Sequence, residues 1–245
     1  MSSAPALPLA ARFALWFSAW CEGRASLDEA RDAVVGGDAA HHVTGIPGQR
    51  DAVPVILALG LLRAAGATGA GLALPVPGDP LGLAGPAPFN TAVLEAGQGV
   101  VLTGSDLGLV PARAGAGVVW VTHPASSRRQ VPDPSEAGSA LQQVLLETAA
   151  RLADLDVARW RPEVADELMA LRRQTDLDVP PAMSQRSTTL AALASRCRTI
   201  VALALDDDGG ALTVAESEQR RAALSPLDHA ARRALVAACA FPFQG

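Results

Sequence analysis

The stretch GVVLTGSDLGLVPARAGAGVVWVTH, residues 99–123, decides the fold class of this chain. It contains short runs of β-branched and aliphatic residues, separated by turn-forming Gly, Ser, Asp and Arg. The runs occupy residues 99–104, 107–112 and 116–123. Such spacing is typical of an antiparallel meander. A further run, GLALPV at 71–76, precedes them, so the sequence predicts a small, mostly antiparallel sheet over about residues 70–123.

Signals for helix starts lie on both sides of this region. Ser26 opens a capping box, and Asp133 is followed by a proline and then by an acid three residues on. Further signals predict helices from Arg161, from Ser225 and over residues 187–205, although 199–205 alone would also pass for a buried strand. Because helices come first, strands next and helices again, the order indicates an α+β fold. We expect N-terminal helices and a C-terminal helical region to cover the sheet.

The length and the linkers leave two domain organisations open. A chain of 245 residues fits one α+β domain spanning 1–245. The polar, proline-containing segment 126–134 is the best candidate for a linker. It would divide the chain into an α+β unit at 1–125 and a helical unit at 134–245.

The composition excludes several kinds of chemistry. All 20 basic residues are arginine, and tyrosine is absent. Schiff-base catalysis, a P-loop lysine and tyrosine acid–base chemistry are therefore excluded. The net charge of −5 argues against a nucleic-acid partner. Proton transfer near neutral pH would depend on histidine, cysteine or a carboxyl group with a shifted pKa.

The cysteines and apolar segments bear on the compartment. Cys21, Cys197 and Cys239 are odd in number and far apart, which fits reduced thiols better than a disulfide framework. The apolar stretch 6–20 lacks the basic region and cleavage site of a signal peptide. The apolar run at 52–62 is too short to cross a bilayer. We expect a soluble, cytoplasmic protein without a membrane span.

An aromatic stripe lies near the N-terminus. Phe13, Trp16, Phe17 and Trp20 recur at the spacing of one helix face. Such a stripe either packs on the protein's own core or forms a contact with a partner, because exposed aromatic patches mark interfaces. The second alternative makes these residues candidates for a homo-oligomer interface.

One histidine motif is a candidate for acid–base or metal chemistry. Asp38, His41 and His42 lie close together in a glycine-rich connector between predicted helices. Carboxylate and imidazole are good ligands for zinc, iron or manganese, but the sequence identifies no third ligand. His42 and Asp38 are therefore catalytic candidates, and all three residues are candidate metal ligands; a purely structural role is the alternative.

Two further segments are candidates for binding an anion. The loop 78–90 is rich in Gly and Pro and precedes a short predicted helix, whose N-terminus favours anions. His123 lies just past a predicted strand and is followed by two hydroxyls and two arginines, a set suited to phosphate or carboxylate. The candidate ligand-binding residues are Gly78, Asp79, Gly82, Gly85, Asn90, Ser126, Ser127, Arg128 and Arg129. His123 would be the titrating group of such a site.

These observations support two hypotheses about function. The leading one is a non-catalytic binding, regulatory or scaffolding protein that acts as a homo-oligomer. Two observations support it: the aromatic stripe from Phe13 to Trp20 is a candidate interface, and none of the common catalytic motifs is present. The alternative is an enzyme or sensor for a small phosphate- or carboxylate-bearing ligand, held between the loop 78–90 and the segment 123–129. Neither hypothesis calls for a cofactor.

Overall fold

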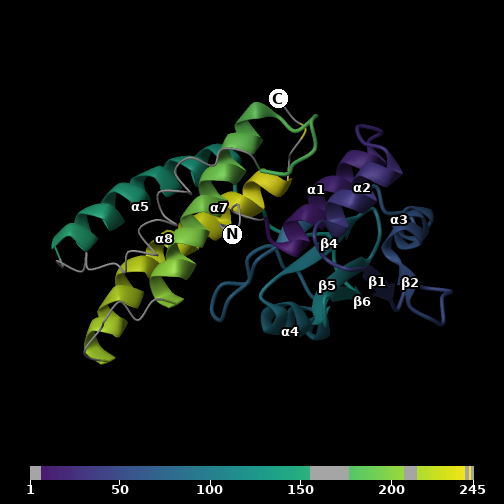
Figure 1. Ribbon diagram of the computed structural model, residues 1–245, viewed down its shortest axis with the longest axis horizontal. Helices are drawn as coiled ribbons and strands as arrows, with labels where there is room; N and C mark the ends of the chain where they lie inside the picture. Colours follow the sequence, from purple (N-terminus) through teal and green to yellow (C-terminus); the bar gives the residue numbers. More distant parts are fainter. Residues whose placement is uncertain (1–6, 155–176, 207–213, 241–242, 244–245) are drawn as a thin grey trace. The chain divides into compact units, whose positions relative to one another are not determined.

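The computed structural model describes residues 7–154, 177–206, 214–240 and Phe243 (Figure 1). Within them, helices flank a six-stranded mixed sheet, which confirms the predicted α+β class. The helices are α1 (Leu9–Cys21), α2 (Leu27–Val35), α3 (Val55–Ala64), α4 (Ala87–Ala96), α5 (Pro134–Asp154), α7 (Gln185–Asp206) and α8 (Val214–Ala240). The strands are β1 (His41–Thr44), β2 (Val53–Pro54), β3 (Gly69–Ala73), β4 (Gly99–Thr103), β5 (Leu107–Ala114) and β6 (Gly117–Pro124).

The sheet has the strand order β2-β1-β6-β5-β4-β3. The four strands from β3 to β6 form the antiparallel part that the sequence predicts. β1 pairs with β6 in parallel, and β2 pairs with β1 at the edge. The sheet therefore extends beyond the predicted range of about 70–123. β1 was not predicted, because HHVT is short and begins with two histidines, which gives no alternating apolar pattern.

One face of the sheet is turned toward α1. Leu72, Val100 and Leu109 are paired across β3, β4 and β5, so they share this face, and all are fully buried. Trp120 of β6 lies on the same face and contacts Phe13 of α1, with ring centroids 4.9 Å apart. The face carrying Trp120 forms the main core.

The open edge of the sheet at β3 is partly covered by α1. The Ser18 hydroxyl accepts a hydrogen bond from the Ala70 N–H at 2.9 Å and donates to the Ala70 carbonyl. These bonds satisfy backbone groups that an edge strand otherwise leaves open to pairing with another chain.

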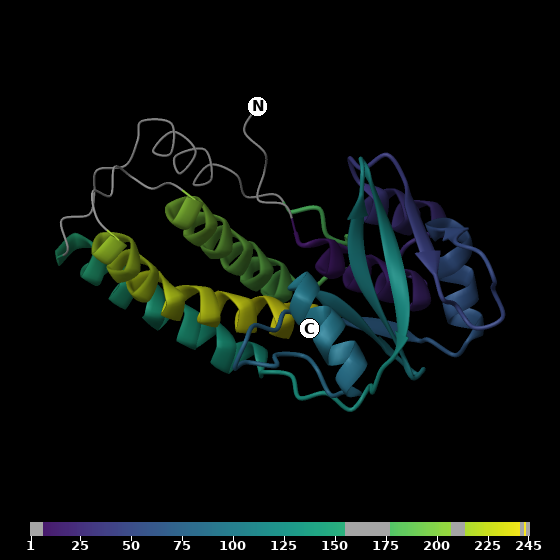
Figure 2. The same cartoon turned by 90° about the horizontal axis from the view of Figure 1, so that it is seen from below.

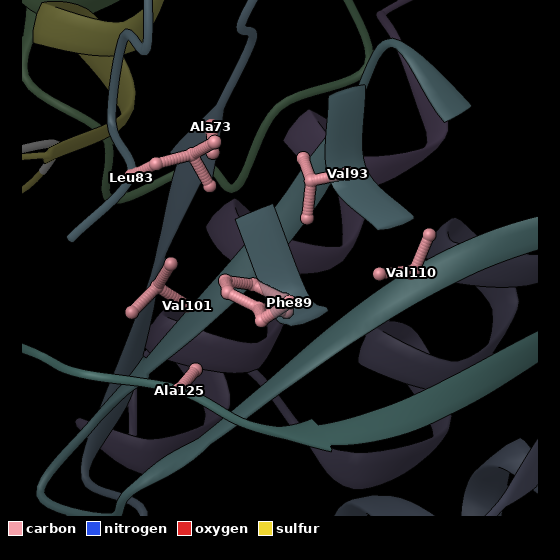
Figure 3. Close-up of a cluster of buried hydrophobic side chains, with 7 residues drawn as sticks. All are labelled: Ala73, Leu83, Phe89, Val93, Val101, Val110 and Ala125. Atoms are coloured by element: carbon pink, nitrogen blue, oxygen red, sulfur yellow. The ribbon is translucent and has the colours of Figure 1, made fainter. Parts of the chain in front are cut away.

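The opposite face lies under α4 (Figure 3). Phe89 and Val93 of α4 form a buried cluster with residues of the strands and the adjoining loops. The other members are Ala73, Leu83, Val101, Val110 and Ala125. Glycine makes the close approach possible: a Cβ at Gly108 would lie 2.5 Å from the Phe89 ring, and one at Gly99 would lie 2.7 Å from Val93. Small residues on this face therefore position α4.

Several helix signals are confirmed. Ser26 and Glu29 form the reciprocal capping box at the start of α2. The Asp133 carboxylate accepts hydrogen bonds from two backbone N–H groups of the first turn of α5. Residues 187–205 are helical and lie within α7. The helix expected from Arg161 lies outside the described residues.

The helix start expected at Ser225 is wrong. Val214–Ala240 form one helix with Pro226 in its interior. An internal proline removes one hydrogen bond and usually ends or bends a helix. Here Leu224 and Leu227, on either side of the proline, are buried in the helical region. Their burial on one continuous face offsets the lost hydrogen bond.

The chain divides into two compact units, which we describe separately. The sheet unit comprises residues 7–131, 178–184 and 239–245, and contains α1 to α4 with the sheet. The helical unit contains α5, α7 and most of α8, and Figure 2 shows these three helices running side by side. Whether the units fold independently, as the predicted subdivision implies, stays a prediction.

One helix in the described part of the chain, within α7 at Gln185–Leu205, is long and apolar enough to cross a membrane by length and composition. A buried helix of a soluble protein meets the same criterion, so this is weak support for a membrane span.

Candidate functional site

The strongest polar cluster in the sheet unit is centred on Asp38, just after α2. The Asp38 carboxylate accepts a hydrogen bond from His41 Nε2 at 2.9 Å and another from Arg113 Nη1. Arg12 of α1 adds an ion pair at 3.6 Å. We call these four residues with Trp120 the Asp38 cluster. Only Asp38 and His41 were candidates from the sequence; the arginines and Trp120 lie far from them in the chain, and no local pattern links them.

Both nitrogens of His41 are committed within this cluster. Trp120 Nε1 donates to His41 Nδ1 at 3.2 Å. An indole N–H can only donate, so Nδ1 is unprotonated and Nε2 carries the proton that it donates to Asp38. The His41 side chain is fully buried. No lone pair remains for a substrate proton or a metal ion, so the geometry fits a structural histidine.

The surroundings keep His41 neutral. Burial lowers the pKa of His41 from its ordinary value of 6.5, although Asp38 opposes this shift. The partial burial of Asp38 would by itself raise the pKa of its carboxyl group. Hydrogen bonds from His41 and Arg113 outweigh that effect and hold this pKa below its usual value.

The lowered pKa of His41 predicts a loss of stability in mild acid. As the pH falls, His41 takes up a proton near pH 6.5 in the unfolded chain but only at lower pH in the folded protein. Its contribution to the free energy of unfolding is therefore complete above pH 6.5 and declines below that pH until His41 of the folded protein is protonated as well. The slope from this one group is at most about 1.4 kcal/mol per pH unit. Urea unfolding at a series of pH values from neutral to mildly acidic measures it.

His41→Gln should flatten this dependence, because glutamine does not titrate. His42→Gln is the matched control, since His42 is the next residue, is only half-buried and points to the other face of β1. A His41→Gln variant whose stability falls with pH as steeply as that of the wild type would contradict the assignment.

The other histidine candidates do not join the Asp38 cluster. His42 pairs in register with Val119, and His123 pairs with Gly108, so both lie on the face opposite Trp120. The His123 ring is 6.1 Å from the Phe89 ring, centroid to centroid. Within the part of the chain that the structure describes, no three His, Cys, Asp or Glu side chains gather as a metal site.

The loop 78–90 and the segment 123–129 do lie together. Ser126 N–H donates to the Gly85 carbonyl at 2.9 Å, and Gly85 N–H donates to Asn90 Oδ1 at 3.0 Å. Leu83 of the loop and Ala125 of the segment both belong to the buried cluster around Phe89. The Asp79 N–H likewise donates to Val76. The N–H groups of Asp79, Gly85 and Ser126 are therefore already paired within the protein and are not available to an anion in this arrangement.

The two arginines of the second segment have different environments. Arg129 Nη1 donates to the Leu72 carbonyl at 3.1 Å, and its guanidinium occupies the space that a side chain at Gly71 would need. Burial lowers the pKa of Arg129. Arg128 and Ser127 are exposed. Arg129 therefore attaches the segment to β3, and in this arrangement Arg128 and Arg129 do not bind an anion together.

The aromatic stripe packs inside the sheet unit. Phe13 and Phe17 are fully buried, and Trp16 is 7% exposed. Trp20 is half-buried, with Arg63 4.9 Å from its ring centroid. Of the two alternatives for this stripe, the structure favours the one in which it belongs to the protein's own core.

The cysteines remain free thiols in the structure. Cys197 and Cys239 are buried, and Cys21 is half-buried. Burial raises the pKa of Cys197 to about 11 and that of Cys239 to about 12. Thiols with such pKa values are poor nucleophiles at neutral pH.

Two hollows in the helical unit were not predicted from the sequence. One, of about 450 Å³, lies between α5 and α8 and includes Ala140 and Pro226 in its lining. The other, of about 330 Å³, lies between α7 and α8 and includes Arg198 and Asp228. Both depend on α8 being continuous past Pro226, whereas the sequence predicted a new helix from Ser225. The internal proline is the one signal that could have drawn attention to this region.

The sheet unit, with its internally paired polar cluster, and the helical unit, with its hollows, define a two-unit α+β protein. Residues 10–136 match the model of the N-terminal domain of the Rv1486c-like protein family, and residues 135–236 match that of the C-terminal domain. The chain belongs to the Rv1486c-like protein family. No curated protein and no solved structure matches it.

Proposed function

We propose that this chain is a non-catalytic binding protein, with a regulatory or scaffolding role, that acts as a homo-oligomer in the cytoplasm. The main observation behind this proposal is the hollow between α5 and α8, so the helical unit would bind the partner. The internal pairing of the Asp38 cluster adds support, since it leaves His41 no free nitrogen for catalysis. The free thiols are in keeping with a reducing compartment.

The hollow between α5 and α8 has the character of a groove for a helix. α5 contributes Ala137, Ala140 and Val144, which follow helical spacing, and α8 contributes Pro226 and Ala230. Because the side chains on both helices are small, a groove remains between the helices. Grooves lined in this way bind the apolar face of a partner helix. Polar groups at Ser225, His229 and Arg233 complete the lining.

A second copy of this chain supplies a fitting partner. Leu146 of α5 is 74% exposed, the highest value among the large apolar side chains in the described residues. Glu147 beside it is exposed and negative, whereas the groove carries the positive Arg233. Leu146 lies on the opposite side of α5 from Ala137 and Val144 of the groove. In a head-to-tail assembly each copy would therefore place Leu146 in the groove of the next copy, with Glu147 near Arg233.

Leu146→Gln should therefore convert the oligomer to a monomer. Losing the buried leucine removes about 1.5–3 kcal/mol from each contact. Light scattering coupled to size exclusion, over a range of protein concentrations, measures the mass. Ala140→Trp, which fills the groove, should give the same result.

Leu57→Gln is the matched control, because Leu57 is 52% exposed on α3 of the sheet unit and lies outside the groove. A wild-type protein that stays monomeric at high micromolar concentration would refute the proposal. So would an oligomer unaffected by both groove variants.

A further inference from the structure

We propose that the hollow between α7 and α8 is a binding site for the phosphoryl group of a small organic molecule. Its residues are Arg198, Val201, Ala202 and Leu205 from α7 and Arg221, Ser225 and Asp228 from α8. None of them was a candidate from the sequence. This site is separate from the groove between α5 and α8, apart from Ser225, which borders both.

Arg198 is the group that most requires a partner. Its Nε is buried and has no hydrogen-bond partner within the described residues. The carboxylate that faces it is Asp228, whose Oδ1 lies 3.9 Å from that Nε, beyond hydrogen-bond distance. Burial lowers the pKa of Arg198, which reflects how much hydration its guanidinium has lost. A bound anion would restore the missing hydrogen bonds.

Asp228 neutralises the site only in part, because its carboxylate is shared by two arginines, Arg198 and Arg232. Its Oδ2 accepts a hydrogen bond from Arg232 Nε at 3.0 Å, so it is already engaged by another arginine. Arg221 also borders the hollow and forms no ion pair within the residues that the structure describes. Three arginines, Arg198, Arg221 and Arg232, thus lie around the single carboxylate of Asp228, and the excess positive charge at Arg198 and Arg221 is available to an anion.

The charge and shape of the hollow favour a phosphate monoester. A phosphoryl group carries about −1.5 to −2 charges and three acceptor oxygens, which matches two guanidinium groups better than a single carboxylate does. Val201, Ala202 and Leu205 form an apolar wall beside the charged groups. A volume of about 330 Å³ is at the small end of ligand pockets, so the ligand would pair the phosphoryl group with a small apolar portion.

Isothermal titration of the full chain with phenyl phosphate, inorganic phosphate and benzoate tests this proposal, at constant ionic strength of about 0.15 M. Phenyl phosphate should bind most tightly, because it engages both the arginines and the apolar wall. Arg198→Gln and Arg221→Gln should each raise its Kd about tenfold or more, since each removes a charge-assisted hydrogen bond. Arg221 is exposed, so this second variant keeps the test valid if Arg198→Gln fails to fold.

Arg151→Gln is the matched control, because Arg151 is exposed on α5 and does not line the hollow. Phosphatidic acid vesicles, compared with phosphatidylcholine vesicles, separate a lipid headgroup from a soluble phosphate as the source of the phosphoryl group. Failure of every phosphorylated probe to bind would overturn the proposal, as would binding that Arg151→Gln weakens as much as the other variants do. The groove variants Leu146→Gln and Ala140→Trp should leave phenyl phosphate binding unchanged, so the two proposals can fail separately.

Discussion

Trp120→Ala is expected to destabilise the sheet unit by about 3–5 kcal/mol, the range for removing a large aromatic side chain from a core. Trp120 is fully buried and packs against Phe13 of α1. It also donates the hydrogen bond that occupies His41 Nδ1. The substitution therefore opens a cavity and leaves a buried nitrogen without a partner. Urea unfolding followed by circular dichroism would measure the free energy of unfolding.

Trp120→Phe separates the two effects. Phenylalanine retains most of the ring contact with Phe13 but has no N–H, so the loss should be about 1–3 kcal/mol, the cost of an unsatisfied buried polar group together with a smaller ring. Trp20→Phe is the control, because Trp20 is only half-buried, and it should cost less than about 1 kcal/mol. Equal effects at the two tryptophans would contradict the structural role given to the Asp38 cluster.

Gly108→Ala is expected to cost about 1–3 kcal/mol, as overpacking of a well-filled core does. The added Cβ would lie 2.5 Å from the Phe89 ring and 2.9 Å from the Val100 carbonyl oxygen. Phe89 is 1% exposed within the cluster under α4, so the ring has little room to move. The effect would be steric, because Gly108 does not adopt the left-handed backbone conformation.

The cause can be tested with a double-mutant cycle. Phe89→Leu shortens the side chain that opposes Gly108, so Gly108→Ala should cost less in that background than in the wild type. Gly60→Ala provides a control of opposite sign: a Cβ there meets nothing within 4 Å, and alanine in a helix is more stable than glycine by about 0.5–1 kcal/mol. Additive effects of Gly108→Ala and Phe89→Leu would rule out the contact as the cause.

The sequence alone determined the α+β class and the antiparallel strands from β3 to β6. It also determined α2 and the start of α5. These features depend on local patterns: alternation of apolar residues, turn residues, and capping groups within three or four positions of a helix start. Ser26 and Asp133 illustrate this, because each bonds to backbone groups a few residues away.

Contacts between distant residues decided the rest. β1 forms only because β6 offers it a parallel partner, and α8 continues past Pro226 because Leu224 and Leu227 are both buried. The bonds of His41 to Asp38 and Trp120 turn an apparent catalytic motif into a buried structural group, and Trp120 is 79 positions away in the chain. The hollow at Arg198 likewise arises where α7 and α8 meet. Local sequence patterns report backbone preference, whereas the partners of a buried polar side chain are set by packing between elements, so only the tertiary structure could determine them.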